Sequence, residues 1–168
     1  MDRELQDPAR AAPQVWKHDW FSYEQYRVVH DNYMERLRAE GMVTRSFLTF
    51  SESGSRDGNL VAVQLAGIVV CHQVIIRIDK KMAVRRDRQN RYQVRTQYYQ
   101  YHAMVARRNG QPRRNLIRFD NAHGEDGLHC HRFDAIGSEV SRVPISLEHL
   151  PTLDEFVRLA VAIAEGSR

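Results

Sequence analysis

The segment YQVRTQYYQYHAMVAR, residues 92–107, decides the predicted fold. It is rich in Tyr, Val and Thr, which favour extended strands. The Asn109–Gly110 pair that follows is a strong signal for a tight hairpin turn, and residues 115–120 (NLIRFD) supply the returning strand. The sequence therefore predicts an antiparallel hairpin in the centre of the chain.

Further segments with strand-type composition lie on both sides of this hairpin. In residues 74–79, Val74, Ile76 and Ile78 alternate with Ile75, Arg77 and Asp79, which is typical of a half-buried strand. Residues 51–59 predict a polar loop and residues 85–90 a charged turn. The other predicted strands cover residues 45–50, 60–70, 129–135 and 140–143.

Two helices are predicted, one near each end of the chain. Ser22 with Gln25 resembles a capping box that begins a helix over about residues 23–40, and Gly41 is a natural end. Thr152 with Glu155 forms a second capping box before an apolar helical face. We expect an α+β fold: an antiparallel meander of five to seven strands, with an N-terminal and a C-terminal helix packed on one face. Residues 1–13 are expected to be a flexible leader and residues 14–168 a single α+β domain with a basic hairpin at 77–118.

Composition favours a cytoplasmic location. The 168 residues include only two cysteines, and they form no spaced pair, so a disulfide framework is not expected. The first residues contain no apolar stretch of the signal-peptide type. The most apolar region, residues 60–78, is interrupted by polar side chains and is not expected to span a membrane.

Positive charge is concentrated in one quarter of the chain. Residues 77–118 carry 13 basic and two acidic side chains, whereas the segments before and after are net acidic. Eleven of the 13 are arginines, which suit bidentate phosphate contacts and stacking on bases. We therefore expect a nucleic-acid partner, with RNA favoured. The alternative is that solvated hairpin tips in an arginine-rich protein simply collect charge. The residues expected to bind nucleic acid are Arg85, Arg86, Arg88, Arg91, Arg95, Arg107, Arg108, Arg113 and Arg114.

The residues that can carry chemistry lie between Tyr98 and Asp134. Histidine titrates near neutrality and suits general acid–base work, and arginine can stabilise a phosphate transition state. This combination suits RNA cleavage without a metal or cofactor, with His123 and His131 as acid and base and Arg118 or Arg132 on the phosphate. The full predicted catalytic set is His102, Arg118, Asp120, His123, His129 and His131.

Other interpretations of these residues stay open. His129 and His131 alternate on a strand and can bind zinc together with His123 and Asp120. The same histidines can also be ordinary structural hydrogen-bonding residues. The tyrosines of residues 98–101 can either stack on bases or pack across strands.

Four short motifs resemble the TumE-like toxin family of bacterial toxin–antitoxin systems. They are YQYH (99–102), RFDNAH (118–123), HCHRF (129–133) and ISLEHLPTLDEFV (145–157). The chain departs from the family in having Gly124 and HCHR where the family commonly has a proline and a His-His-Lys-His type run. The resemblance covers roughly residues 92–164 and implies a growth-inhibiting toxin that acts on RNA and is neutralised by a DNA-binding antitoxin.

Two functions follow as expectations. The first is a toxin-type ribonuclease that works without a cofactor; it requires several of the histidines to share a pocket with an arginine. The second is a non-catalytic nucleic-acid-binding subunit of a defence or mobile-element complex, which requires only a continuous Arg/Tyr surface. Residues 92–107 can also form an exposed edge strand that pairs with another chain to give an oligomer.

Overall fold

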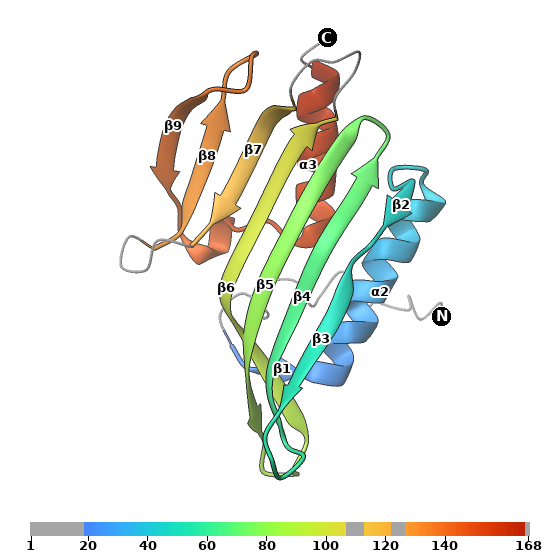
Figure 1. Cartoon of the computed structure of the whole chain (residues 1–168), viewed down its shortest axis with the longest axis vertical. Coiled ribbons are helices and arrows are strands. Elements are labelled where there is room, and N and C mark those ends of the chain that lie inside the picture. The colour runs from blue at the N-terminus through green and yellow to red at the C-terminus, as the bar shows by residue number, and fades with distance from the viewer. Residues whose placement is uncertain (1–18, 107–112, 122–126, 167–168) are drawn as a thin grey trace, which may run out of the picture.

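The computed structural model describes residues 19–106, 113–121 and 127–166, and shows one twisted antiparallel sheet with two helices on the same face (Figure 1). The sheet has nine strands in the order β2-β4-β5-β6-β7-β8-β9, with β1 paired to β6 and β3 paired to β4. This confirms the predicted α+β class. The elements are β1 (Phe21–Ser22), α2 (Tyr23–Ala39), β2 (Arg45–Ser46), β3 (Thr49–Gly54), β4 (Leu60–Cys71), β5 (Val74–Arg86), β6 (Tyr92–Val105), β7 (Arg114–Asp120), β8 (His129–Phe133), β9 (Glu139–Pro144), the short 3-10 helix η3 (Leu147–His149) and α3 (Leu153–Gly166).

Strand β6 lies inside the sheet. It pairs with β5 along almost its full length, while its other side pairs with β1 near Val94 and with β7 from Gln100 to Val105. The prediction that this segment can form an exposed edge is therefore wrong. Both sides of its backbone already have partners within the chain.

Two strands extend further than the sequence predicted. Strand β3 continues to Gly54 through residues predicted as a polar loop, and β5 continues to Arg86 through residues predicted as a turn. Polar side chains are accommodated because β3 is an edge strand and most of its residues are exposed. Gly67 in β4 permits the chain between β2 and β3 to pass close by: a Cβ atom there would lie 2.1 Å from the carbonyl oxygen of Phe47.

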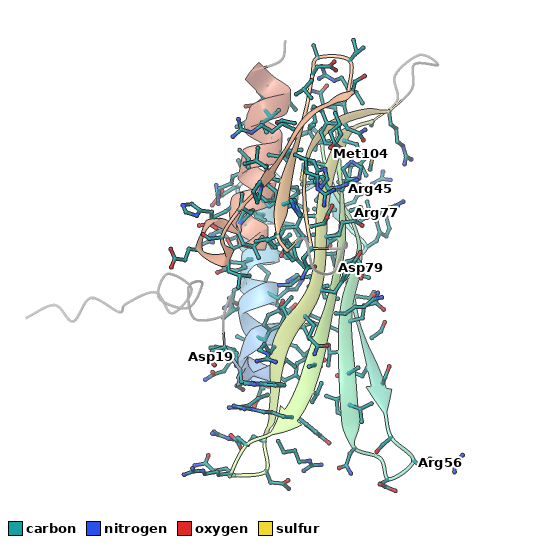
Figure 2. The ribbon with its side chains drawn as sticks, turned by 90° about the vertical axis from the view of Figure 1, so that its left-hand side faces the viewer. Asp19, Arg45, Arg56, Arg77, Asp79 and Met104 are labelled. Carbon is teal, nitrogen blue, oxygen red and sulfur yellow. The ribbon has the colours of Figure 1, made fainter. Side chains whose placement is uncertain are left out.

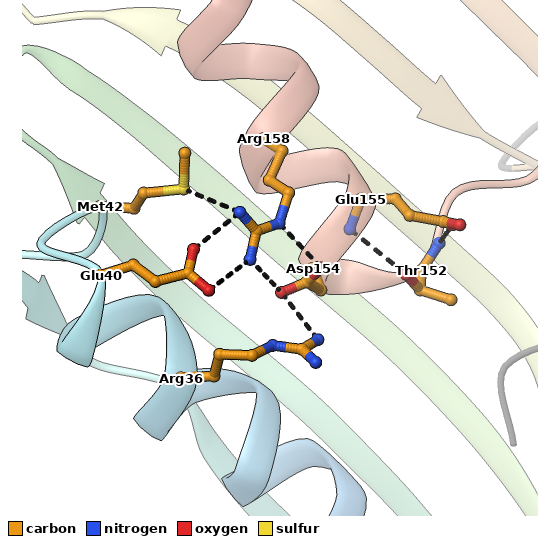
Figure 3. A network of polar contacts seen from close by, with 7 residues as sticks. All are labelled: Arg36, Glu40, Met42, Thr152, Asp154, Glu155 and Arg158. Atoms are coloured by element: carbon orange, nitrogen blue, oxygen red, sulfur yellow. Dashed lines mark hydrogen bonds and ion pairs between the residues drawn. The ribbon is translucent and has the colours of Figure 1, made fainter. Parts of the chain in front are cut away.

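Both helices begin, and α2 ends, where local sequence signals place them. The Ser22 side chain accepts from the backbone N–H of Gln25, and Thr152 and Glu155 exchange the two hydrogen bonds of a capping box. A partly exposed polar network then joins α2 to α3 (Figure 3). In it, Asp154 pairs with Arg36 at 3.1 Å and with Arg158 at 3.0 Å.

The main core lies between the sheet and the two helices. Ile76 and Ile78 of β5 and Phe156 of α3 are at most 1% exposed. A smaller cluster around Tyr23, Val63 and Met82 continues the core beneath the first turns of α2. Within the described residues, neither helix has the length and apolar character needed to cross a bilayer. The predicted leader and the Asn109–Gly110 turn lie outside the described residues.

Candidate nucleic-acid interface and buried histidine network

Strand alternation and register bring the functional side chains onto the sheet face that points away from α2 and α3, here called the open face. Figure 2 shows Arg45, Arg77 and Asp79 on this side, opposite the helices. The paired positions on neighbouring strands place one row across five strands and a second row beside it. The first row is Arg77, His102, Arg118, His131 and Arg142, and the second is Asp79, Gln100, Asp120 and His129.

Five of the six predicted catalytic residues therefore share the open face. Four of them, Arg118, Asp120, His129 and His131, lie close together. Glu139 and Arg142 of β9 complete this network. The Nε atom of Arg118 lies 2.6 Å from Oδ2 of Asp120, and Nε2 of His131 lies 3.3 Å from the same oxygen. Nδ1 of His131 lies 3.1 Å from Oε2 of Glu139. His129 lies beside this group, with its Nδ1 atom 3.4 Å from the Arg142 guanidinium and its ring centroid 6.4 Å from that of His131.

Burial limits what this network can do. The side chains of His131 and Asp120 are 2% and 1% exposed, and that of Arg118 is 24% exposed. Both ring nitrogens of His131 already face carboxylate oxygens. In this conformation a phosphate cannot contact the His131 ring. The network instead joins β7, β8 and β9 through the Arg118–Asp120 ion pair and the contacts of His131 with Asp120 and Glu139.

His102 is the most accessible of the described histidines in the predicted set. Its Nε2 atom lies 2.9 Å from Oδ1 of Asn115, whose side-chain amide donates to the carbonyl oxygen of Gly137. The Asn115 oxygen must therefore accept, so Nε2 of His102 carries the proton and Nδ1 is the free acceptor in the neutral ring. Burial lowers the pKa of His102, although its hydrogen bond with Asn115 partly opposes this effect.

His123, the other predicted acid or base, lies outside the described residues. The zinc interpretation of His129 and His131 depends on the same residue. Among the described residues, no group of three or more metal-ligating side chains is arranged to hold an ion.

The predicted basic hairpin is divided between the two ends of β6. Arg85, Arg86, Arg88 and Arg91 lie at the β5–β6 turn, whereas Arg114 pairs with Val105 at the far end of β6. Thirteen residues of strand separate these ends, or about 40 Å at 3.3 Å per residue. The structure therefore does not show the single basic surface that the sequence predicted. Arg113 lies beside Arg114, Arg95 lies within β6 near the turn, and Arg107 and Arg108 lie outside the described residues.

The arginines at the β5–β6 turn differ in their contacts and exposure. Arg86 donates to Asn59, Asn90 and the hydroxyl of Tyr92, so it ties the β5–β6 turn to the β3–β4 turn. Arg91 pairs with Asp87 at 2.9 Å. Arg88 is exposed at the tip.

Arg85 and Arg95 lie against a tryptophan. Their guanidinium carbons are 4.5 and 4.9 Å from the ring centroid of Trp20. Such contacts hold the guanidinium planes in place while leaving their edges available for hydrogen bonds. The Trp20 ring thus orders two cations at one end of the open face.

Arg77 and Lys81 on the open face were missing from the predicted binding set. They occupy alternate positions of β5, and the Lys81 ammonium lies 5.2 Å from the ring centroid of Tyr98. The alternation of apolar and polar residues from position 74 onward was the signal that could have found them. Tyr99 and Tyr101 are 2% and 3% exposed in the core. Of the two interpretations of these tyrosines, packing across strands is therefore the correct one, and stacking on bases is not.

Comparison of the chain with protein-family models, with curated proteins and with solved structures gave no match.

Proposed function

We propose that this chain binds single-stranded RNA through the open face of its sheet. The observation that carries the proposal is a set of four cations on this face: Arg77, Lys81, Arg85 and Arg95. Within the described part of the chain, none of the four has a carboxylate within 4.0 Å. A basic surface without internal counter-ions favours a polyanionic partner.

The arrangement of these cations suits an extended strand of nucleic acid. From Arg77 to Arg85 the chain advances eight residues along β5, about 26 Å. The rings of Tyr98 and Trp20 lie beside three of the four cations: Lys81, Arg85 and Arg95. Aromatic rings next to a basic groove are the usual means of holding unpaired bases without sequence preference.

Fluorescence anisotropy with a labelled oligouridylate tests the proposal. Four phosphate contacts predict that log K falls with log salt with a slope of about −3, at about 0.7 per contact for a single strand. Arg77→Glu/Lys81→Glu should weaken binding at least about tenfold and reduce the magnitude of this slope by about 1.4.

Arg38→Glu provides the matched control, because Arg38 is an exposed residue of α2 on the helical side of the sheet. We expect Arg38→Glu to bind with nearly the affinity of the wild type. Arg38→Glu reverses one charge and the double variant reverses two, so a loss of log K in the control that is half as large as in the double variant would show that only net charge matters. Unchanged binding by the double variant would refute the open-face interface.

A toxin-type ribonuclease is the second candidate, and one observation favours it. His102 lies next to Arg118 across two paired strands, with its Nδ1 atom left as a possible proton acceptor. A base beside a guanidinium is the minimum required for attack by a 2′-hydroxyl on the adjacent phosphate. The resemblance to the TumE-like toxins supports growth inhibition and an antitoxin partner. A cytoplasmic location suits both candidates, and the described cysteines, Cys71 and Cys130, are free thiols.

Expression in bacteria separates cleavage from binding. A ribonuclease should arrest growth and degrade total RNA, and His102→Gln and His123→Ala should each reduce both effects. Intact RNA and normal growth with the wild type would exclude the ribonuclease candidate. His131→Ala is a poor choice for this test because it removes a buried side chain that contacts Asp120 and Glu139, so a loss of activity would not be separable from a loss of stability.

A further inference from the structure

A small pocket lies on the opposite side of the sheet from the open face, between α2, the central strands and the segment that leads into α3. Its volume is about 80 Å³. Tyr26, His30 and Tyr33 border it from α2, and Lys80, Tyr99 and Tyr101 border it from β5 and β6. Leu147, Leu150 and Pro151 form an apolar rim.

Lys80 is an unusual residue for this position. It follows Ile76 and Ile78 on the core-facing side of β5, where its neighbours are apolar. Its ammonium donates to the hydroxyl of Tyr26 at 2.6 Å and lies 5.1 and 6.0 Å from the ring centroids of Tyr26 and Tyr101. In the described part of the chain no carboxylate lies within 4.0 Å of it. Among the described residues this half-buried cation thus contacts a hydroxyl and aromatic rings but has no carboxylate, the usual partner of a charge that loses water.

Among the described residues, one further polar group in the pocket wall has no hydrogen-bond partner. The hydroxyl of Tyr99 is buried and makes no hydrogen bond among the described residues. Buried hydroxyls are rarely left without one. An acceptor in the pocket would meet the partly exposed Lys80 ammonium before this covered hydroxyl.

Lys80 supplies the charge of the pocket. Burial and the nearby Lys80 ammonium lower the pKa of His30 to about 4, so His30 is neutral near pH 7. Burial raises the pKa of Tyr26 and of Tyr99, which therefore stay protonated. One positive charge matches a monoanion, whereas a phosphate dianion would remain partly uncompensated.

We propose that this pocket binds the carboxylate group of a small organic acid. The volume corresponds to about two to three water molecules at 30 Å³ each, which suits a carboxylate and leaves the apolar part of the ligand against the rim. This site goes beyond the proposed RNA interface and faces the other side of the sheet. Lys80 and Lys81 are consecutive residues of β5 that serve different surfaces.

Titration of the full-length protein with sodium benzoate, followed by amide chemical shifts in NMR spectra, tests this site. Benzamide is the neutral probe of the same shape, and inorganic phosphate is the competing anion. We expect benzoate to give saturable shifts at residues around Lys80, and benzamide and phosphate to bind at least about tenfold more weakly.

Lys80→Met removes the charge while keeping an unbranched side chain, and Lys81→Met makes the same change on the open face. We expect Lys80→Met to lose benzoate binding and Lys81→Met to keep it, with the fold of both variants confirmed by their spectra. If Lys80→Met fails to fold, Lys80→Arg should retain binding. Absence of saturation in the wild type, equal binding of benzamide, or equal binding of phosphate would each overturn the carboxylate assignment, as would unchanged binding by a folded Lys80→Met.

Discussion

Replacing His30 with phenylalanine should remove much of the acid sensitivity of the fold. His30 is 6% exposed on α2, and its ring lies 5.3 Å from that of Phe50 in an edge-on contact that a phenyl ring can preserve. Burial and the Lys80 charge lower its pKa from 6.5 to about 4 in the folded state. Between these two pH values the unfolded chain therefore binds more protons than the folded chain. Stability contributed by neutral His30 is fully present above pH 6.5 and is lost as the pH falls toward 4.

The size of the effect follows from the two pKa values. Between about pH 7 and about pH 4.5, proton uptake by His30 in the unfolded chain costs the fold about 2 kcal/mol. Burial also lowers the pKa of His102, which adds to the acid sensitivity of both proteins and cancels in the comparison.

Urea unfolding of wild type and His30→Phe at both pH values measures the difference directly. We expect the free energy of unfolding of the variant to fall by about 2 kcal/mol less than that of the wild type. Parallel losses in the two proteins would refute the reasoning. NMR titration of the wild-type His30 ring provides an independent check, since a pKa near 6.5 would contradict it even if the variant failed to fold.

Three further substitutions test the fold. Gly67→Ala should lower the free energy of unfolding by about 3 kcal/mol or more. The new Cβ would clash with the carbonyl of Phe47, and the φ of residue 67, 144°, is one that alanine rarely adopts. Thermal unfolding measures this, and a loss near zero would show that the crossing between β2 and β3 is looser than described. Thr152→Ala should cost about 1 kcal/mol through loss of the capping box, measured by urea unfolding; an unchanged midpoint would contradict the role of the cap. Asp154→Asn should lower the free energy of unfolding by about 1–2 kcal/mol. Arg36 and Arg158 would lose a shared carboxylate that is 12% exposed, and the loss is limited because both arginines are partly solvated. Combination with Arg158→Met should then be less than additive, and full additivity would show that the two residues do not interact.

Local chemistry made parts of the candidate site predictable. The alternation within residues 129–131 correctly placed His129 and His131 on one face, since the side-chain period of a strand is two. The same rule applied to β5 would have placed Arg77 and Lys81 on the open face. Capping residues and periodic apolar positions located both helices for similar reasons.

Burial of the histidine network was not predictable from these patterns. His131 becomes inaccessible because Asp120 and Glu139 approach its ring from β7 and β9, and this depends on the register of three strands. The division of the basic segment had the same origin. A count of charges along the chain cannot show that Arg85 of β5 and Arg114 of β7 lie beside opposite ends of β6.

The sequence by itself determined the α+β class, the two helices and most of the strands, because propensity, capping and periodicity act over a few neighbouring residues. Tertiary structure alone decided which charged side chains of the described residues formed ion pairs and which had no carboxylate nearby. It also created the pocket around Lys80, where residues 26–33 meet residues 80–101 and 147–153. Such pairings depend on strand register and helix packing, which join residues far apart in the chain and leave no local signal in it.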